Sequence, residues 1–399
     1  MSVARTSFYF QPPVGNLSYA ALTAGRGRRD PEIASRTGRE LEFFSSGTMA
    51  LAAAVQIAVE RRPTDSPRVV VPAYSCPDLV AAVRFAGAEP EFADMRADST
   101  NMLAAAVDEA FERAGEEAVA VIGVDLFGLP EDWPALAEIA KRRNALLIQD
   151  CAQSVQAPEA YPGELAGDAV IFSFGRGKPV CCLTGGALLT RPGIGRESDG
   201  YPQGGGSTLP LRLKNTAYNV LVRPRPYALL AMLMGDRLGA TRYVPLERIE
   251  APDAGVAALL EHAVADYWAQ HRDTTIAVFE ALDKLVSGAD KLRWPAPLNA
   301  AACVRRLSRL PLLVDSAEGR DRLQAALVAA GISATTMYGR SLPTIVAEYD
   351  GVANTLYTPN AARFAAHLLT VPVHDRLRPT DIERMRVAIA DWAGSGGAP

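Results

Sequence analysis

The sequence lacks several features that mark whole classes of protein. No apolar run approaches the ~20 residues that a membrane-spanning helix requires, and the N-terminus has no apolar core of a signal peptide. Four histidines occur without a His/Cys or His/carboxylate cluster, so no metal site is expected. Five cysteines form an odd set with no framework spacing. This is typical of reduced thiols in a cytoplasmic protein.

A strong excess of charge is also missing. The chain has 399 residues with 41 Lys+Arg and 45 Asp+Glu, which gives a net charge of −4. Such a chain has no general attraction to a polyanion, so nucleic acid is not expected as a ligand. Hydrophobic residues make up 49% of the sequence, as in folded globular proteins, and the length suits two or three domains.

Short apolar runs alternate with helical windows in the first half of the chain. The apolar runs are 68–71, 91–94, 118–122 and 145–148, and the helical windows between them are 77–86, 103–114 and 132–143. This alternation predicts βαβ crossovers and a mostly parallel sheet flanked by helices. Two further runs, 168–173 and 186–190, have no helix between them and are expected to pair antiparallel or to lie at a sheet edge.

The rest of the chain predicts a second, smaller unit. Residues 191–253 are rich in glycine and proline and indicate an irregular connector with one or two helices, and helical periodicity resumes over 254–285. Strand and helix patterns then alternate at 310–314, 317–330, 368–371 and 379–393. We therefore expect a large α/β domain over 1–253, followed by a linking helix and a small C-terminal α+β domain over 254–399.

Two candidate site features precede or follow predicted elements. Ser45-Ser46-Gly47-Thr48 directly precedes a helical window. This turn is either a plain N-cap, through Ser45 or Ser46, or a phosphate site at the positive end of the helix. Asp150 follows a predicted strand, where ligands of open α/β sheets collect. Its carboxylate either caps a helix or holds a ring nitrogen or a metal.

Two more features lie further along the chain. Ser173-Phe-Gly-Arg-Gly-Lys178 leaves a strand into a glycine-flanked turn, and Thr184-Gly185-Gly186 forms a tight turn just beyond. Alone, each is explained by an exposed loop lysine and an ordinary hairpin. In combination, the four features describe pyridoxal 5'-phosphate: a phosphate on a helix N-terminus, an aspartate on the pyridinium nitrogen, and a lysine that forms a Schiff base.

The order of these motifs resembles the DegT/StrS-type sugar aminotransferases, which are fold type I pyridoxal phosphate enzymes. The segments that carry the resemblance are Ser46-Gly-Thr48, Pro72-Ala-Tyr-Ser-Cys76, Asp125-Leu-Phe-Gly-Leu-Pro130, Gln149-Asp-Cys-Ala-Gln153, Phe172-Ser-Phe174, Lys178, Gly185-Gly186 and Leu368-Leu-Thr-Val-Pro-Val-His-Asp375. The resemblance is densest over 43–190. It implies a mostly parallel sheet flanked by helices, a small C-terminal α+β domain, and a homodimer with shared active sites.

The resemblance also implies a role for each matched residue. Lys178 would be the Schiff-base and proton-transfer lysine, Asp150 the pyridinium partner, and Gln153 a hydrogen-bond donor near the ring O3′. Ala152 would pack beneath the ring. The phosphate would be held by Gly47, Thr48 and Ser173. The implied reaction moves an amino group from an amino acid, Glu or Gln, to a keto-sugar that is nucleotide-linked.

Three positions depart from the family pattern. Cys76 stands where the family has an aromatic residue that stacks on the ring, and Tyr74 is the alternative candidate for that role. Asp125 replaces a histidine on the substrate side. The family's asparagine that reaches the partner subunit's phosphate has two candidates here, Asn215 and Asn219. These departures keep open an aminotransferase for a non-sugar carbonyl, such as a lipid or polyketide aldehyde or ketone, and a non-catalytic regulatory homologue.

An apolar run at 227–234 follows two arginines, Arg223 and Arg225. One interpretation is a buried or dimer-interface helix. The other is a surface around 226–235 that contacts a membrane or receives a lipid-linked substrate. The sequence leaves both interpretations open.

Overall fold

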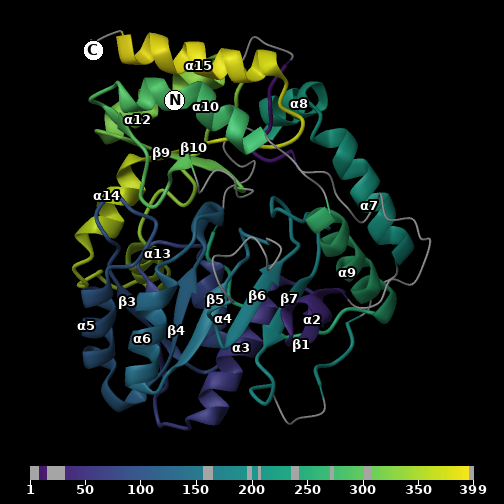
Figure 1. The fold of residues 1–399 in the computed structure, drawn as a ribbon, viewed down its shortest axis with the longest axis vertical. Coiled ribbons are helices and arrows are strands. Elements are labelled where there is room, and N and C mark those ends of the chain that lie inside the picture. Colours follow the sequence, from purple (N-terminus) through teal and green to yellow (C-terminus); the bar gives the residue numbers. More distant parts are fainter. Residues whose placement is uncertain are drawn as a thin grey trace.

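The computed structural model describes residues 9–15, 32–155, 165–195, 200–204, 208–234, 242–269, 274–300 and 307–394. Figure 1 shows two layers of architecture, with the large sheet and its helices below and a small domain capped by α15 above. The predicted α/β class is confirmed. None of the helices in these ranges is long and apolar enough to cross a membrane.

Seven strands form the large sheet. They are β1 (Glu40–Phe44), β2 (Arg68–Pro72), β3 (Glu89–Ala93), β4 (Ala118–Val124), β5 (Leu146–Asp150), β6 (Ala169–Ser173) and β7 (Gly186–Thr190). Their order is β1-β7-β6-β5-β4-β2-β3. The pairs β3–β2, β2–β4, β4–β5 and β5–β6 are parallel. Strand β7 is antiparallel to both of its neighbours, β6 and β1. The expected antiparallel pairing of 168–173 with 186–190 is therefore confirmed. The alternative, a position at the sheet edge, is wrong because the edge is formed by β1, a strand that the sequence did not predict.

Helices flank this sheet on both sides. They are α2 (Glu32–Thr37), α3 (Gly47–Arg61), α4 (Asp78–Phe85), α5 (Ala104–Ala114) and α6 (Trp133–Arg143), with short 3₁₀ turns η1 (Gly115–Glu117) and η2 (Leu126–Gly128). Strand β4 is buried at every position and β2 at all but its first, as expected for a sheet covered on both faces. Burial of these Val, Ile and Ala side chains supplies the main hydrophobic core.

The small domain has a three-stranded antiparallel sheet in the order β10-β9-β8. Its strands are β8 (Leu292–Arg293), β9 (Leu310–Val314) and β10 (Leu368–Val371), and its helices are α10 (Thr274–Ser287), α12 (Ala317–Ala329), α13 (Leu342–Asp350), α14 (Pro359–His367) and α15 (Pro379–Gly394). A separate core joins α10, α12 and α15 to this sheet. Side chains from α13 and α14 instead join the core of the large sheet.

The connector contains two helices, α7 (Thr208–Leu221) and α8 (Pro224–Met234). The helical window at 254–285 divides into α9 (Ala254–Ala269) and α10. Leu260 and Val264 of α9 pack in one core with Phe172 of β6. Thus α9 is part of the large domain by its packing, although it follows the expected boundary at residue 253. The domain division itself stays a prediction.

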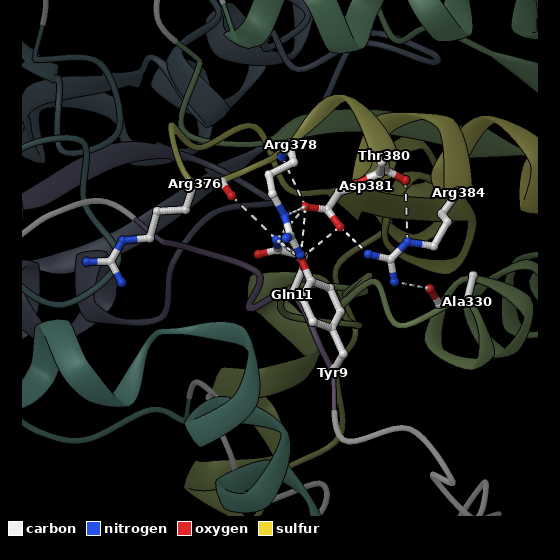
Figure 2. Close-up of polar contacts among 8 residues, drawn as sticks. All are labelled: Tyr9, Gln11, Ala330, Arg376, Arg378, Thr380, Asp381 and Arg384. Atoms are coloured by element: carbon white, nitrogen blue, oxygen red, sulfur yellow. Dashed lines mark hydrogen bonds and ion pairs between the residues drawn. The ribbon is translucent and has the colours of Figure 1, made fainter.

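The N-terminal segment Tyr9–Gly15 is bound to the small domain. The buried carboxylate of Asp381 accepts hydrogen bonds from Tyr9 Oη at 2.9 Å and from Gln11 Nε2 at 2.7 Å. Arg378 and Arg384 pair with the same carboxylate and lie over the Tyr9 ring, as Figure 2 shows for the polar contacts. This network fixes the path by which the segment approaches the large domain.

Candidate active site

The candidate residues come together at the carboxyl ends of the central strands. Asp150 is the last residue of β5 and Ser173 is the last residue of β6, which pairs with β5 in parallel. Helix α3 begins at Gly47, beside the end of β6. Cys76 follows β2, and Lys178 lies in the connection between β6 and β7. Because parallel strands end at one edge of a sheet, residues far apart in sequence share one site.

Ser46, and not Ser45, is the N-cap of α3. Its Oγ accepts a hydrogen bond from Met49 N at 3.2 Å, and its backbone is extended, so Ser46 is the N-cap. The first N–H groups of the helix, at Gly47 and Thr48, precede the first intrahelical hydrogen bond, from Ala50 N to Ser46 O. The N-cap interpretation is therefore confirmed, and it leaves donors available for an anion.

Gly47 is required by a close approach to Ser173. A Cβ at Gly47 would lie 2.4 Å from Ser173 Cβ and 2.6 Å from Ser173 Oγ. No side chain fits there, so the hydroxyl of Ser173 faces the N-terminus of α3 at short range. The structure thus brings together the three residues that the resemblance assigned to a phosphate, since Thr48 is half-buried on the same turn.

Asp150 is a buried carboxylate with few protein donors. Its side chain is 8% exposed, and Oδ1 accepts a hydrogen bond from Ala152 N at 2.8 Å. Burial raises the pKa of Asp150 from 3.8 to about 6, against the lowering effects of this hydrogen bond and of the positive charge of Lys178. Residues 151–155 form a turn rather than a helix, so the helix-capping alternative is wrong. The carboxylate is held where a cationic ligand group would satisfy it.

Lys178 is well placed among the five lysines of the chain. Lys141, Lys214 and Lys284 are exposed on helices, whereas Lys178 and Lys291 are half-buried. Its charge lowers the pKa of both Asp150 and Cys76, which shows that the three side chains lie near one another. The backbone N–H of Lys178 donates to Gly175 O at 3.3 Å, closing the turn that carries it.

Gln153 is held by groups from three parts of the chain. Its Oε1 accepts hydrogen bonds from Phe127 N at 3.1 Å and from Ser308 Oγ at 3.3 Å. Its Nε2 donates to Tyr338 Oη at 3.2 Å. These bonds fix which end of the amide is the donor and which is the acceptor. Ala152 is the half-buried neighbour of Gln153 in the same turn.

Sequence reasoning did not find Ser308 or Tyr338. Both reach Gln153 from the small domain, and 185 positions separate Tyr338 from Gln153. Neither residue belongs to a motif that could have indicated a role. The small domain therefore supplies part of the wall of the site.

The structure distinguishes between Cys76 and Tyr74. Tyr74 is 1% exposed, and its ring packs edge-on against Phe364 at 5.0 Å between centroids. Its ring is therefore part of the core. Cys76 is half-buried. Burial and the nearby Asp78 raise the pKa of its thiol to about 12, so the thiol stays protonated at neutral pH. Of the two residues, Cys76 is the one that faces Asp150 and Lys178.

Asp125 is fully buried, and its carboxylate binds residues of the turn that follows β5. Oδ1 accepts hydrogen bonds from Trp133 Nε1 at 3.0 Å and Glu131 N at 3.2 Å, and Oδ2 accepts from Ser154 Oγ at 2.7 Å. Burial raises the pKa of this carboxyl, and these donors oppose the rise. Asp125 therefore holds the turn after β5 in place from a position closed to solvent.

Both candidate asparagines are engaged within their own chain. Asn215 is fully buried, and its Nδ2 donates to Cys182 O at 3.1 Å. Asn219 accepts hydrogen bonds from Arg376 through its backbone O, at 3.0 Å, and through Oδ1, at 3.3 Å.

In the described ranges no cluster of three or more His, Cys, Asp or Glu side chains could hold a metal ion. Of the five cysteines, Cys303 lies outside these ranges.

A buried carboxylate, a nearby lysine and the N-terminus of a helix lie at the carboxyl ends of a mostly parallel sheet, an arrangement similar to that of the fold type I aminotransferases. Residues 43–197 match the model of the DegT/DnrJ/EryC1/StrS aminotransferase family. The resemblance drawn from the motifs is thereby confirmed for this region. It covers every candidate site residue from Gly47 to Lys178.

Two curated relatives align with the same part of the chain. GDP-perosamine synthase of Escherichia coli O157:H7 is 30% identical over 150 residues, which are 37% of this chain and 39% of that protein. UDP-N-acetyl-3-dehydro-alpha-D-glucosamine 3-aminotransferase of Acidithiobacillus ferrooxidans is 34% identical over 131 residues, 33% of this chain and 34% of that protein. The chain thus spans little more than a third of the length of these relatives.

Solved structures match nearly the whole chain in fold. A DegT DnrJ EryC1 StrS aminotransferase from Brucella abortus superposes with a TM-score of 0.64 at 23% identity, over 97% of this chain and 92% of that one. The PLP-form of a putative sugar aminotransferase from Streptococcus pneumoniae gives 0.68 at 16% identity, over 99% of both chains. The expected fold type I architecture, with its small C-terminal α+β domain, is confirmed.

Proposed function

We propose that this protein is a pyridoxal 5'-phosphate-dependent aminotransferase that moves an amino group from an amino acid, Glu or Gln, to a keto-sugar carried by a nucleotide. The observation that supports this most strongly is the placement of Asp150 and Lys178 around the start of α3. The curated relatives named for nucleotide-sugar synthesis support the substrate class.

The residues of the site fit pyridoxal phosphate. Gly47, Thr48 and Ser173 would bind the phosphate, and Asp150 would bind the protonated ring nitrogen, which relieves the cost of its own burial. Gln153 would donate to the ring oxygen through its amide. Cys76 would lie against the ring face. The bound cofactor supplies an electron-accepting ring that stabilises negative charge at the substrate Cα.

Lys178 would act twice in each half-reaction. Its Nζ would first hold the cofactor, and after displacement by the incoming amine it would carry the proton from the substrate Cα to the cofactor side. Asp150 remains ionised beside the ring nitrogen and keeps that nitrogen protonated. The balance is one amino acid converted to a 2-oxo acid and one keto-sugar converted to an amino sugar.

Several arginines near the site support an anionic acceptor. Arg176 is exposed two residues before Lys178, and the charges of Arg176 and Arg376 both act on Tyr218. Arg309 lies near both Tyr218 and Tyr338, and Tyr338 contacts Gln153 of the site. The guanidinium of Arg309 contacts the neutral acceptors Pro13 O and Thr335 Oγ1. No ion pair involves Arg176, Arg309 or Arg376 within the ranges that the structure describes. An acceptor with phosphates would satisfy these charges.

The test is a pair of half-reactions followed by absorbance. The purified protein is loaded with pyridoxal phosphate, and the visible band of the bound cofactor is followed first with a panel of amino acids and then with a panel of carbonyl acceptors. Loss of the band with Glu or Gln and its return with a nucleotide-linked keto-sugar are expected. Return only with a lipid or polyketide carbonyl would favour the non-sugar alternative. No band change with any donor would favour a regulatory homologue.

A further inference from the structure

The helical hairpin formed by α7 and α8 exposes an apolar surface. Leu209 and Leu213 on α7 are each 65% exposed, and on α8 Leu229 is 55% and Leu233 is 77% exposed. Figure 1 places the two helices along one outer edge of the molecule, away from the large sheet. The interpretation of 227–234 as a buried helix is therefore wrong for half of that run, and its interpretation as a dimer-interface helix stays a prediction.

The inner faces of the two helices pack against the body of the protein. Tyr227, Ala228 and Ala231 of α8 pack on Phe10, and the rings of Phe10 and Tyr227 stack at 5.9 Å. On α7 the buried Asn215 anchors the helix through Cys182 O. Both helices are thus fixed to the body of the protein by one side, and the opposite side remains apolar.

The exposed positions follow helical spacing. Leu209, Leu213 and Val220 are separated by four and seven residues, so they lie in one stripe along α7. On α8, Leu229, Met232 and Leu233 form a second stripe, and Arg225 lies one turn before it on the same side. Each helix therefore carries a surface of apolar side chains.

The same hairpin has a one-sided charge. Residues 208–234 contain four basic residues, Arg212, Lys214, Arg223 and Arg225, and no Asp or Glu, although the whole chain has a net charge of −4. If the hairpin packed against its own copy at a two-fold axis, two surfaces that carry basic residues and no acidic ones would face each other, which is unfavourable. An anionic lipid surface is complementary to both features, because its phosphates attract the basic residues and its acyl chains accept the apolar stripes.

We propose that the α7–α8 hairpin docks on the surface of an anionic phospholipid bilayer. The exposed leucines and methionine would enter the boundary between headgroups and acyl chains, and the arginines and lysine would bind lipid phosphates. This inference is independent of the proposed aminotransferase function. It assigns the protein a location beside a membrane.

The test is sedimentation of the full-length protein with vesicles of phosphatidylcholine alone and of phosphatidylcholine mixed with phosphatidylglycerol. The protein is expected to sediment with the mixed vesicles only, and less so at high salt. Leu229→Ser with Leu233→Ser should weaken binding by at least about tenfold. Arg223→Gln and Arg225→Gln should each weaken it by about fivefold.

Matched controls come from exposed apolar residues elsewhere. Val352 is 62% and Tyr357 is 86% exposed, and both lie in the loop between α13 and α14. Val352→Ser and Tyr357→Ser should bind vesicles like the wild type, and circular dichroism should show that every variant is folded. Equal binding to both vesicle types, or no effect of the leucine or arginine changes, would overturn the proposal.

Self-association is followed in parallel by light scattering. If the wild type does not bind mixed vesicles and the double leucine variant changes a dimer into a monomer, the hairpin is an interface between copies of this chain. That result would also overturn the membrane proposal.

Discussion

Replacing Asp150 by Asn should stabilise the cofactor-free protein while destroying its function. The ionised carboxylate is costly because it is buried, and the pKa of 3.8 rises to about 6 for that reason. Each pH unit between the two values is worth ~1.4 kcal/mol, so the ionised form costs the folded chain about 3 kcal/mol. Asn has the same shape and can still accept the hydrogen bond from Ala152 N, but it carries no charge.

The sign of the pH dependence follows from the raised pKa. The proton on Asp150 contributes stability that is fully present below the ordinary pKa of 3.8 and is lost as the pH rises through about 6. The advantage of the Asn variant over the wild type should therefore be about 3 kcal/mol at pH about 8, about 1 kcal/mol near pH 4.5, and absent at lower pH.

The assay is urea unfolding of the cofactor-free wild type and Asp150→Asn at these pH values. Asp391→Asn, a change at an exposed aspartate, is the control and should leave the free energy of unfolding nearly unchanged. With pyridoxal phosphate present the order should reverse, because only the carboxylate stabilises a protonated ring nitrogen. An Asn variant that is no more stable at pH about 8, or equally more stable at every pH, would refute the reasoning.

Three further predictions concern residues around the site. Gly47→Ala should lower stability by about 1–3 kcal/mol in urea unfolding, because its Cβ meets Ser173; adding Ser173→Gly should restore stability but not phosphate affinity, and no recovery would contradict the steric cause. Asp125→Ala should lower stability by about 3 kcal/mol by leaving buried donors unpaired, with KM for the acceptor unchanged in the folded fraction; a raised KM would instead place Asp125 at the substrate. Arg176→Gln should raise KM for a phosphorylated acceptor about tenfold with little change in kcat, and an unchanged KM would exclude the contact.

Much of the parallel sheet could be predicted from the sequence because its strands are continuous apolar runs. The strand at 118–124 and the helices around it follow directly from hydrophobic periodicity. Strand β1 was missed because Glu40–Phe44 is an edge strand with only Phe44 buried, so its composition carries no apolar run. Its position depends on pairing with β7, which lies far along the chain.

The candidate site divides in the same way. Gly47, Asp150 and Ser173 were predictable because each stands at the end of an element, and Lys178 because it lies in the glycine-flanked turn that follows β6. Tyr338 was not predictable, because it reaches Gln153 across the interface between two sheets. Such contacts depend on tertiary packing, which no local pattern encodes.

The replacement of a substrate-side histidine by Asp125 illustrates a limit of motif reasoning. Its position in the motif indicated a change at the substrate, whereas the structure places the carboxylate behind the site, in contact with Trp133 and Ser154. The departure therefore affects support of the turn after β5. For α7 and α8 the sequence does not indicate which residues are exposed, and only the structure separates their inner and outer sides.

The most direct test of the central claim is the identity of the lysine that holds the cofactor. The protein loaded with pyridoxal phosphate is reduced with borohydride, digested, and analysed by mass spectrometry. Because the chain has five lysines, the labelled site is unambiguous. The account predicts a single phosphopyridoxyl group on the peptide with Lys178 and none in Lys178→Ala. A label on another lysine, or no label in the wild type, would contradict it.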